Sequence, residues 1–129
     1  MKAYRKVNVK EYSVACCGEY NISLPDAEGV VEAEETAVDV VEMELIRRDV
    51  DELDTHVFET MNGLMGYIVK LKINMVVPVY AGSYEEALRL AEGFLDDMIL
   101  PAGITCISVG AWDSALTEEK SFLLRCKGA

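Results

Sequence analysis

Cationic residues are scarce in this chain. Its 129 residues hold 12 Lys and Arg against 23 Asp and Glu, which gives a formal net charge of −11. Affinity for nucleic acid comes largely from neutralising phosphates with Lys and Arg, so direct nucleic-acid binding is disfavoured. Histidine is scarcer still, because His56 is the only one. For nucleophilic catalysis it would need a cysteine or a serine brought close by folding.

Motifs that carry catalysis are missing as well. No Gly-x-Ser-x-Gly elbow is present, and the glycines at 63 and 66 are too sparse for a phosphate loop and precede a predicted strand. A calcium loop starting at Asp49 fails, because Leu53 takes its fifth position and Thr60 its twelfth. We therefore expect no catalytic residue, no metal site and no cofactor, and we expect that the protein is not an enzyme.

Long apolar runs and paired cysteine motifs are absent too. No stretch approaches the ~20 apolar residues of a membrane span, and the basic residues 1–6 are not followed by the apolar core of a secretion signal. The four cysteines include adjacent Cys16 and Cys17 but no Cys-x-x-Cys pair, so free thiols are expected. These features predict a cytoplasmic protein without membrane association.

The residues that are present suit one folded domain. Half of the chain is apolar, which is enough for a single continuous core at this length. Residues 67–81 alternate apolar and polar side chains and predict a long strand with one buried face. Pro78 cannot donate a ladder hydrogen bond, so the last third of this strand should run along a sheet edge or leave the sheet. Ser83 and Glu86 then form a capping box for a helix that ends before Pro101.

The two ends of the chain predict further strands. Residues 7–9 and 11–24 are rich in Val, Tyr and Ile and predict either a hairpin or one bulged strand, with Gly18 as a bend. Residues 104–112 predict another strand, and residues 121–126 a short third one. The prediction is one α+β domain over residues 1–129, with a mostly antiparallel sheet packed with two or three helices.

The negative charge is concentrated in residues 26–59. This segment holds thirteen acidic residues against Arg47 and Arg48, whereas the rest of the chain balances at ten acids and ten bases. A patch of one sign on a neutral body attracts positive partners and repels nucleic acid and anionic lipid. The segment therefore points to a basic protein surface as partner.

The periodicity of the acidic segment favours helices. In a helix over residues 28–42 five acids stack in one stripe, opposite Val30, Ala33, Ala37, Val40 and Val41. If the same helix is extended, a second apolar stripe, from Ile46 to Val57, falls on the side that the acids occupy, so one straight helix cannot bury both stripes. We therefore expect a break near residues 43–46 and a second helix over about 48–61. The competing interpretation is a strand over residues 37–46.

Two classes of function follow from the acidic stripe. A solvated helix face that keeps the protein soluble is the plain interpretation. The sharper hypothesis is a non-enzymatic protein that inhibits or regulates a basic nucleic-acid-binding complex by imitating a nucleic-acid backbone, as phage-type inhibitors of restriction and CRISPR systems do as a class. The residues expected to contact the partner are Glu28, Glu32, Glu35, Asp39, Glu42 and Asp49.

Other classes of function stay open at this point. A structural or scaffold protein could form a homo-oligomer through the strand over residues 67–81, or through Phe94, Trp112 and Phe122. A small-molecule-binding regulatory domain is a third class, because a pocket depends on packing that the sequence does not reveal. Salt-sensitive binding would favour the acidic stripe, and salt-insensitive self-association would favour a scaffold.

Overall fold

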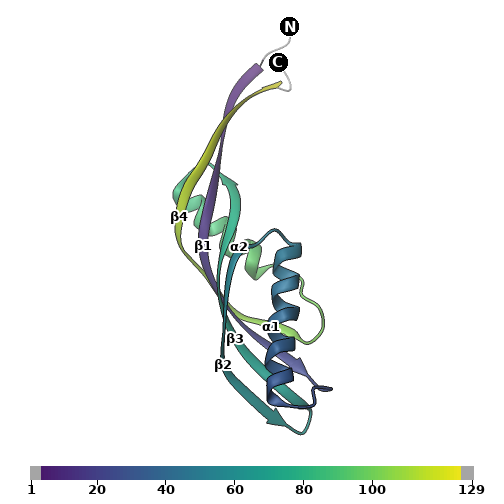
Figure 1. The fold of residues 1–129 in the computed structure, drawn as a ribbon. Coiled ribbons are helices and arrows are strands. Elements are labelled where there is room, and N and C mark those ends of the chain that lie inside the picture. The colour runs from purple at the N-terminus through teal and green to yellow at the C-terminus, as the bar shows by residue number, and fades with distance from the viewer. Residues whose placement is uncertain (1–3, 126–129) are drawn as a thin grey trace.

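The computed structural model describes the backbone of residues 4–125 and the side chains of residues 10–117. The chain forms four strands and two helices in the order β1 (Tyr4–Leu24), α1 (Val30–Arg47), β2 (Asp51–Gly63), β3 (Gly66–Ala81), α2 (Tyr84–Asp96) and β4 (Ile104–Arg125) (Figure 1). The strands make one antiparallel sheet in the order β2-β3-β1-β4. This is a single α+β arrangement with the split β-α-β connection.

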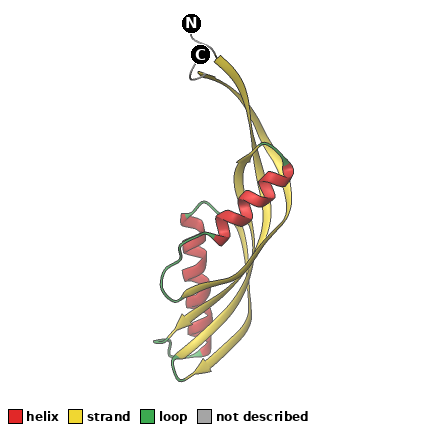
Figure 2. Cartoon of the chain, turned by 180° about the vertical axis from the view of Figure 1, so that it is seen from behind, coloured by secondary structure: helices red, strands yellow, loops and turns green. Residues whose placement is uncertain are grey.

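Both helices cover the same face of the sheet (Figure 2). The strand residues buried beneath them alternate along β1 and β3, as a half-buried sheet requires. They include Val14, Cys16, Tyr20 and Ile22 of β1 and Val69, Leu71, Ile73, Met75 and Val77 of β3. The helices contribute Ala33, Ala37, Val41 and Leu45 from α1 and Ala87, Ala91 and Leu95 from α2. The core therefore lies between this face and the two helices, and no helix of residues 4–125 covers the other face of the sheet (Figure 2).

The predicted strand over residues 67–81 and the helix after it are confirmed. β3 buries the expected alternate side chains, and β2 pairs with it only as far as Val76. Pro78 pairs with Ser13 of β1 beyond that point, so it lies where β3 has become an edge, as its missing N–H predicts. The hydroxyl of Ser83 caps α2 by accepting the N–H of Glu86 at 3.2 Å.

The prediction for residues 43–61 is wrong. α1 continues without a break through the expected kink, and the helix expected over residues 48–61 is the strand β2. The chain leaves α1 through Asp49, which adopts the left-handed conformation (φ 62°) that Asp tolerates better than most residues. Pairing with β3 satisfies the backbone groups on the inner side of β2, which outweighs the apolar spacing that favoured a helix. The competing strand over residues 37–46 is wrong as well.

The terminal strands are longer than predicted. β1 is one continuous strand, so the hairpin alternative is wrong, and Gly18 lies within this strand. The two predicted C-terminal strands join into β4, except for Cys126, which lies outside the described residues. The register between β1 and β4 shifts by one residue at three places, leaving Ile107, Trp112 and Thr117 as the extra residues. Beyond Lys10 and its partner Ala81, β1 and β4 extend together as a two-stranded arm (Figure 1).

The acidic face of α1 and β2

The exposed acids of α1 lie opposite its buried side. Ala33, Ala37, Val41 and Leu45 pack against the sheet, so the carboxylates of Glu32, Glu35 and Asp39 are directed to solvent. At the start of the helix, Oε2 of Glu32 accepts the backbone N–H of Glu28 at 3.1 Å. A carboxylate is favourable at this position because the first N–H groups of a helix carry partial positive charge. Three of the six residues predicted to contact a partner therefore form an exposed row.

Two further acids of α1 are turned toward β2. Oε1 of Glu34 accepts a hydrogen bond from the hydroxyl of Thr60 at 2.7 Å, and Oε2 of Glu42 accepts one from Thr55 at 3.3 Å. Both acids are half-buried. Glu42, which was expected in the exposed stripe, therefore helps to hold α1 against β2. Thr55 and Thr60 are five residues apart, and only the register shift between Val57 and Glu59 brings both to the side of β2 that faces α1, so no sequence signal pointed to this contact.

Strand β2 adds acids that the sequence interpretation did not place at this site. Asp51, Glu52, Asp54 and Glu59 are all exposed on β2. β2 is the edge strand beside α1, but Asp54 and Glu59 are level with Asn74 and Lys70, on the side of the sheet away from the helices, whereas Thr55 and Thr60 face α1. Of the remaining predicted partner-binding residues, Glu28 lies in the exposed loop before α1 and Asp49 in the turn between α1 and β2. We call the exposed acids Glu32, Glu35, Asp39, Asp49, Asp51, Glu52, Asp54 and Glu59 the acidic face, although its β2 members include residues on the side of the sheet away from α1.

Few cations neutralise this surface. Arg47 and Arg48 both pair with Glu44, at 2.9 and 3.6 Å, so the two arginines of the segment serve a carboxylate outside the acidic face. Lys70 of β3 lies 3.3 Å from Glu59, and His56 lies 3.0 Å from Asp54. Among residues 10–117, the other six acids of the acidic face have no cationic side chain within 4 Å. The field of the acidic face is therefore open to a partner.

Among the described side chains, Cys16 and Cys17 are not placed to form a catalytic pair with His56. Burial raises the pKa of the Cys16 thiol to about 12, with Glu92 and Cys17 adding to the effect, so this thiol stays protonated near neutral pH. Half-buried Cys17 lies level with Asp54, on a strand two places away from β2. Two strand spacings amount to ~10 Å, which is too far for proton transfer to His56 on β2. Within the described side chains, no group of three His, Cys, Asp or Glu residues is placed to hold a metal ion.

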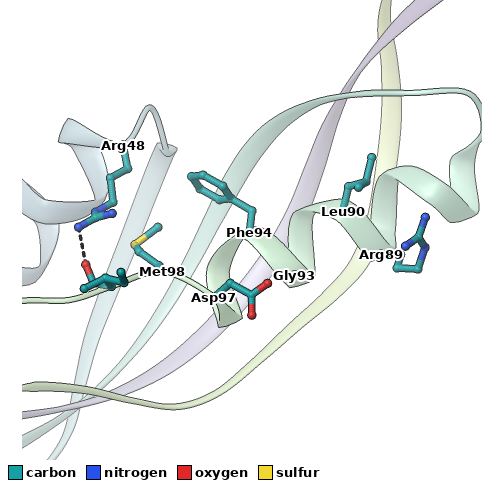
Figure 3. A pocket seen from close by; sticks show the side chains of 8 residues that line it. Arg48, Arg89, Leu90, Gly93, Phe94, Asp97 and Met98 are labelled. Atoms are coloured by element: carbon teal, nitrogen blue, oxygen red, sulfur yellow. Dashed lines mark hydrogen bonds between the residues drawn. The ribbon is translucent and has the colours of Figure 1, made fainter.

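A shallow groove lies beside the end of α1 (Figure 3). Its volume is about 630 Å³, and it is lined by Arg48, Arg89, Leu90, Gly93, Phe94, Asp97, Met98 and Ile99. A guanidinium nitrogen of Arg48 donates to the carbonyl oxygen of Ile99, which ties the end of α1 to the loop after α2. Phe94 and Met98 lie between the two arginines (Figure 3). The lining offers apolar contact and positive charge, but it holds no nucleophile beside a base.

The chain forms an acidic α+β domain with exposed acids on α1 and β2. In the part of the chain that the structure describes, no helix is both long and apolar enough to span a membrane. Comparison with protein-family models, with curated proteins and with solved structures finds no match to this chain.

Proposed function

We propose that this chain is a non-enzymatic binding protein that inhibits or regulates a basic nucleic-acid-binding protein by presenting the acidic face in place of nucleic acid. The observation that carries the proposal is the row of Glu32, Glu35 and Asp39 on the outer side of α1, without cationic partners among the described side chains. Their Cα atoms follow one another at about 4.5 and 6 Å along the helix axis. That spacing is of the same order as the ~3.4 Å axial separation of phosphates along one strand of DNA.

The cost of the row supports a role beyond solubility. Glu32 and Glu35 are three residues apart and Glu35 and Asp39 are four apart, so both pairs are neighbours on the helix surface. Like charges at this spacing destabilise a helix by ~0.2 to 0.5 kcal/mol a pair. Arg47 and Arg48, the two arginines of this segment, form ion pairs with Glu44 and not with the row. A basic partner would relieve this repulsion, and Lys and Arg side chains that bind phosphates also bind carboxylates well.

The direct test compares two variants with the same loss of charge. The first is Glu32→Gln, Glu35→Gln and Asp39→Asn, which keeps an acceptor for the N–H of Glu28. The matched control is Glu85→Gln, Asp96→Asn and Asp97→Asn, three exposed acids at the ends of α2 or just after it. Both variants have the same net charge, so any difference between them depends on where the charge lies.

The assay is capture from a nuclease-treated lysate, followed by competition with the purified captured protein. Wild type and control should recover a basic protein at about 50 mM salt and release it at about 500 mM. They should also displace labelled duplex DNA from that protein, with at least tenfold weaker displacement by the row variant. Equal displacement by all three proteins, or capture without displacement of DNA, would contradict the proposal.

A further inference from the structure

The outer edge of β2 has the features of a surface made to accept another strand. β2 is the last strand of the sheet on its side, so its outer backbone groups are unpaired along its whole length within the described residues. Phe58 lies near its middle and is 55% exposed, although a side chain of this size is usually covered. Four acids and no Lys or Arg lie on this strand. An extended segment with positive charge would match both its backbone and its charge.

The opposite edge of the sheet is a poorer match for a basic segment. Both edge strands carry register shifts, three in β4 against β1 and two in β2 against β3, and such bulges disturb the regular row of groups that a new strand needs. In β2 they leave residues 54–57 and 59–63 in regular pairing. The N–H of Ala111 on β4 is also near Oε2 of Glu92, at 3.4 Å. β4 is therefore the poorer acceptor, and it has a net charge of −1 over its length.

The chain itself contains a segment that matches the edge of β2. β3 ends at Ala81, opposite Lys10, so residues 4–9 of β1 pair with β4 on one side and have no described strand on the other. Residues 4–10 include Arg5, Lys6 and Lys10 and no acid. Of the extended segments with an open side in the described chain, β2 and β4 are acidic and residues 77–81 are uncharged. Residues 4–10 are therefore the basic one.

Pairing of these two segments within one molecule is excluded by their positions. The first residue of β2, Asp51, pairs with Val76, and Val76 is level with Ala15 of β1. Residue 9 lies six positions from that level toward the arm, which is roughly 20 Å at 3.4 Å a residue. From Asp51, β2 extends in the other direction, away from the arm. Only the β2 of another copy can reach residues 4–10.

We propose that the chain self-associates head to tail, with residues 4–10 of one copy adding as a strand to the outer edge of β2 in the next. The two surfaces of each copy are different, so the contact is heterologous and repeats along a filament or closes into a ring. Contact between two copies of the same segment is disfavoured, because β2 would face acids with acids and residues 4–10 bases with bases. This proposal concerns a different partner from the proposed function, and it does not depend on the row of Glu32, Glu35 and Asp39.

The test uses one variant for each side of the contact. The arm variant is Arg5→Glu with Lys6→Glu, and the edge variant is Asp51→Lys with Asp54→Lys. Sedimentation velocity should show that the mass of the wild type rises above 14.3 kDa with concentration. Raising the salt from about 50 to 500 mM should weaken the association about tenfold. Each variant alone should stay monomeric, while an equimolar mixture should assemble again, because the arm of each variant has the charge opposite to that of the edge of the other.

Several results would overturn the proposal. A wild type that stays monomeric, a mixture that stays monomeric, or a variant that assembles as well as the wild type would each contradict it. Melting temperatures establish that the variants fold. A further edge variant, Phe58→Ser, changes no charge and should also weaken association. The row variant of Glu32, Glu35 and Asp39 should assemble like the wild type, so failure of the proposed function would leave this result unaffected.

Discussion

Replacing Gly18 in the centre of β1 by alanine should destabilise the protein, because the space beside it is already filled. A Cβ atom built at Gly18 lies 2.6 Å from Cε2 and 2.9 Å from the hydroxyl of Tyr20, distances that real Cβ atoms do not show. Tyr20 is only 1% exposed, so its ring has little room to move. Overpacking of this kind costs ~1–3 kcal/mol. The variant Gly18→Ala should therefore lose that much unfolding free energy, or roughly 4 °C in Tm for each kcal/mol in a domain of this size.

The control is Gly110→Ala on β4, because a Cβ atom there has no neighbour within 4 Å. Glycine weakens a strand by ~0.5–1 kcal/mol relative to alanine, so this change should leave Tm unchanged or raise it. Thermal unfolding followed by circular dichroism measures both. The cost of Gly18→Ala should also shrink when Tyr20→Leu removes the ring from the same space. A Gly18→Ala protein as stable as the wild type, or an equal cost in both backgrounds, would refute the argument.

Three further predictions concern stability and reactivity. Glu35→Gln removes two like-charge contacts on α1 and should raise the unfolding free energy by ~0.4–1 kcal/mol in urea, and a loss of stability would contradict the electrostatic cost assigned to the row. Ser83→Ala removes the hydroxyl that caps α2 and should cost ~0.5–2 kcal/mol in the same experiment, whereas Ser83→Asp should retain most of the stability. Burial raises the pKa of Cys16 to about 12, so its thiol stays protonated at pH 9. In a Cys126→Ser background, a thiol reagent should therefore label half-buried Cys17 before Cys16, and rapid labelling of Cys16 in folded protein would be the contrary result.

The parts of the fold that follow from local patterns could be predicted from the sequence. The alternation around Val69 and Leu71 places β3, and the Ser83 cap with the spacing of Ala87 and Leu95 places α2. Each of these signals lies within one element and agrees with the burial that the sheet imposes. The overall class, an α+β domain with an antiparallel sheet, followed from them.

The errors arose where distant segments decide the structure. Val50, Leu53 and Val57 fit a helix by spacing, but pairing with β3 makes residues 51–63 a strand, and sequence alone does not supply that partner. The same error separated the acids of β2 from those of α1. It also left Glu42 in the exposed stripe, although the position of β2 turns that side chain toward Thr55. The exposed row of Glu32, Glu35 and Asp39 was predicted because it depends on helix periodicity alone.

The proposed self-association also revises the alternative of a scaffold. β3 lies between β2 and β1 over residues 66–76, so the long strand first considered for self-association is not an available edge there. Phe94 and Trp112 are exposed, whereas the side chain of Phe122 lies outside the described part. The edge strand beside α1, which the sequence suggested as a helix, is the more suitable surface.

The arrangement of β1 and β4 has a mechanical consequence. They are the first and last strands of the chain and run antiparallel, with Tyr4 opposite Arg125 (Figure 1). A pulling force applied to the two ends would therefore load one pair of inter-strand hydrogen bonds at a time, starting at the tip of the arm. The strands would unzip in sequence at low force instead of shearing together, and the sheet beneath the helices would open only after the arm had separated.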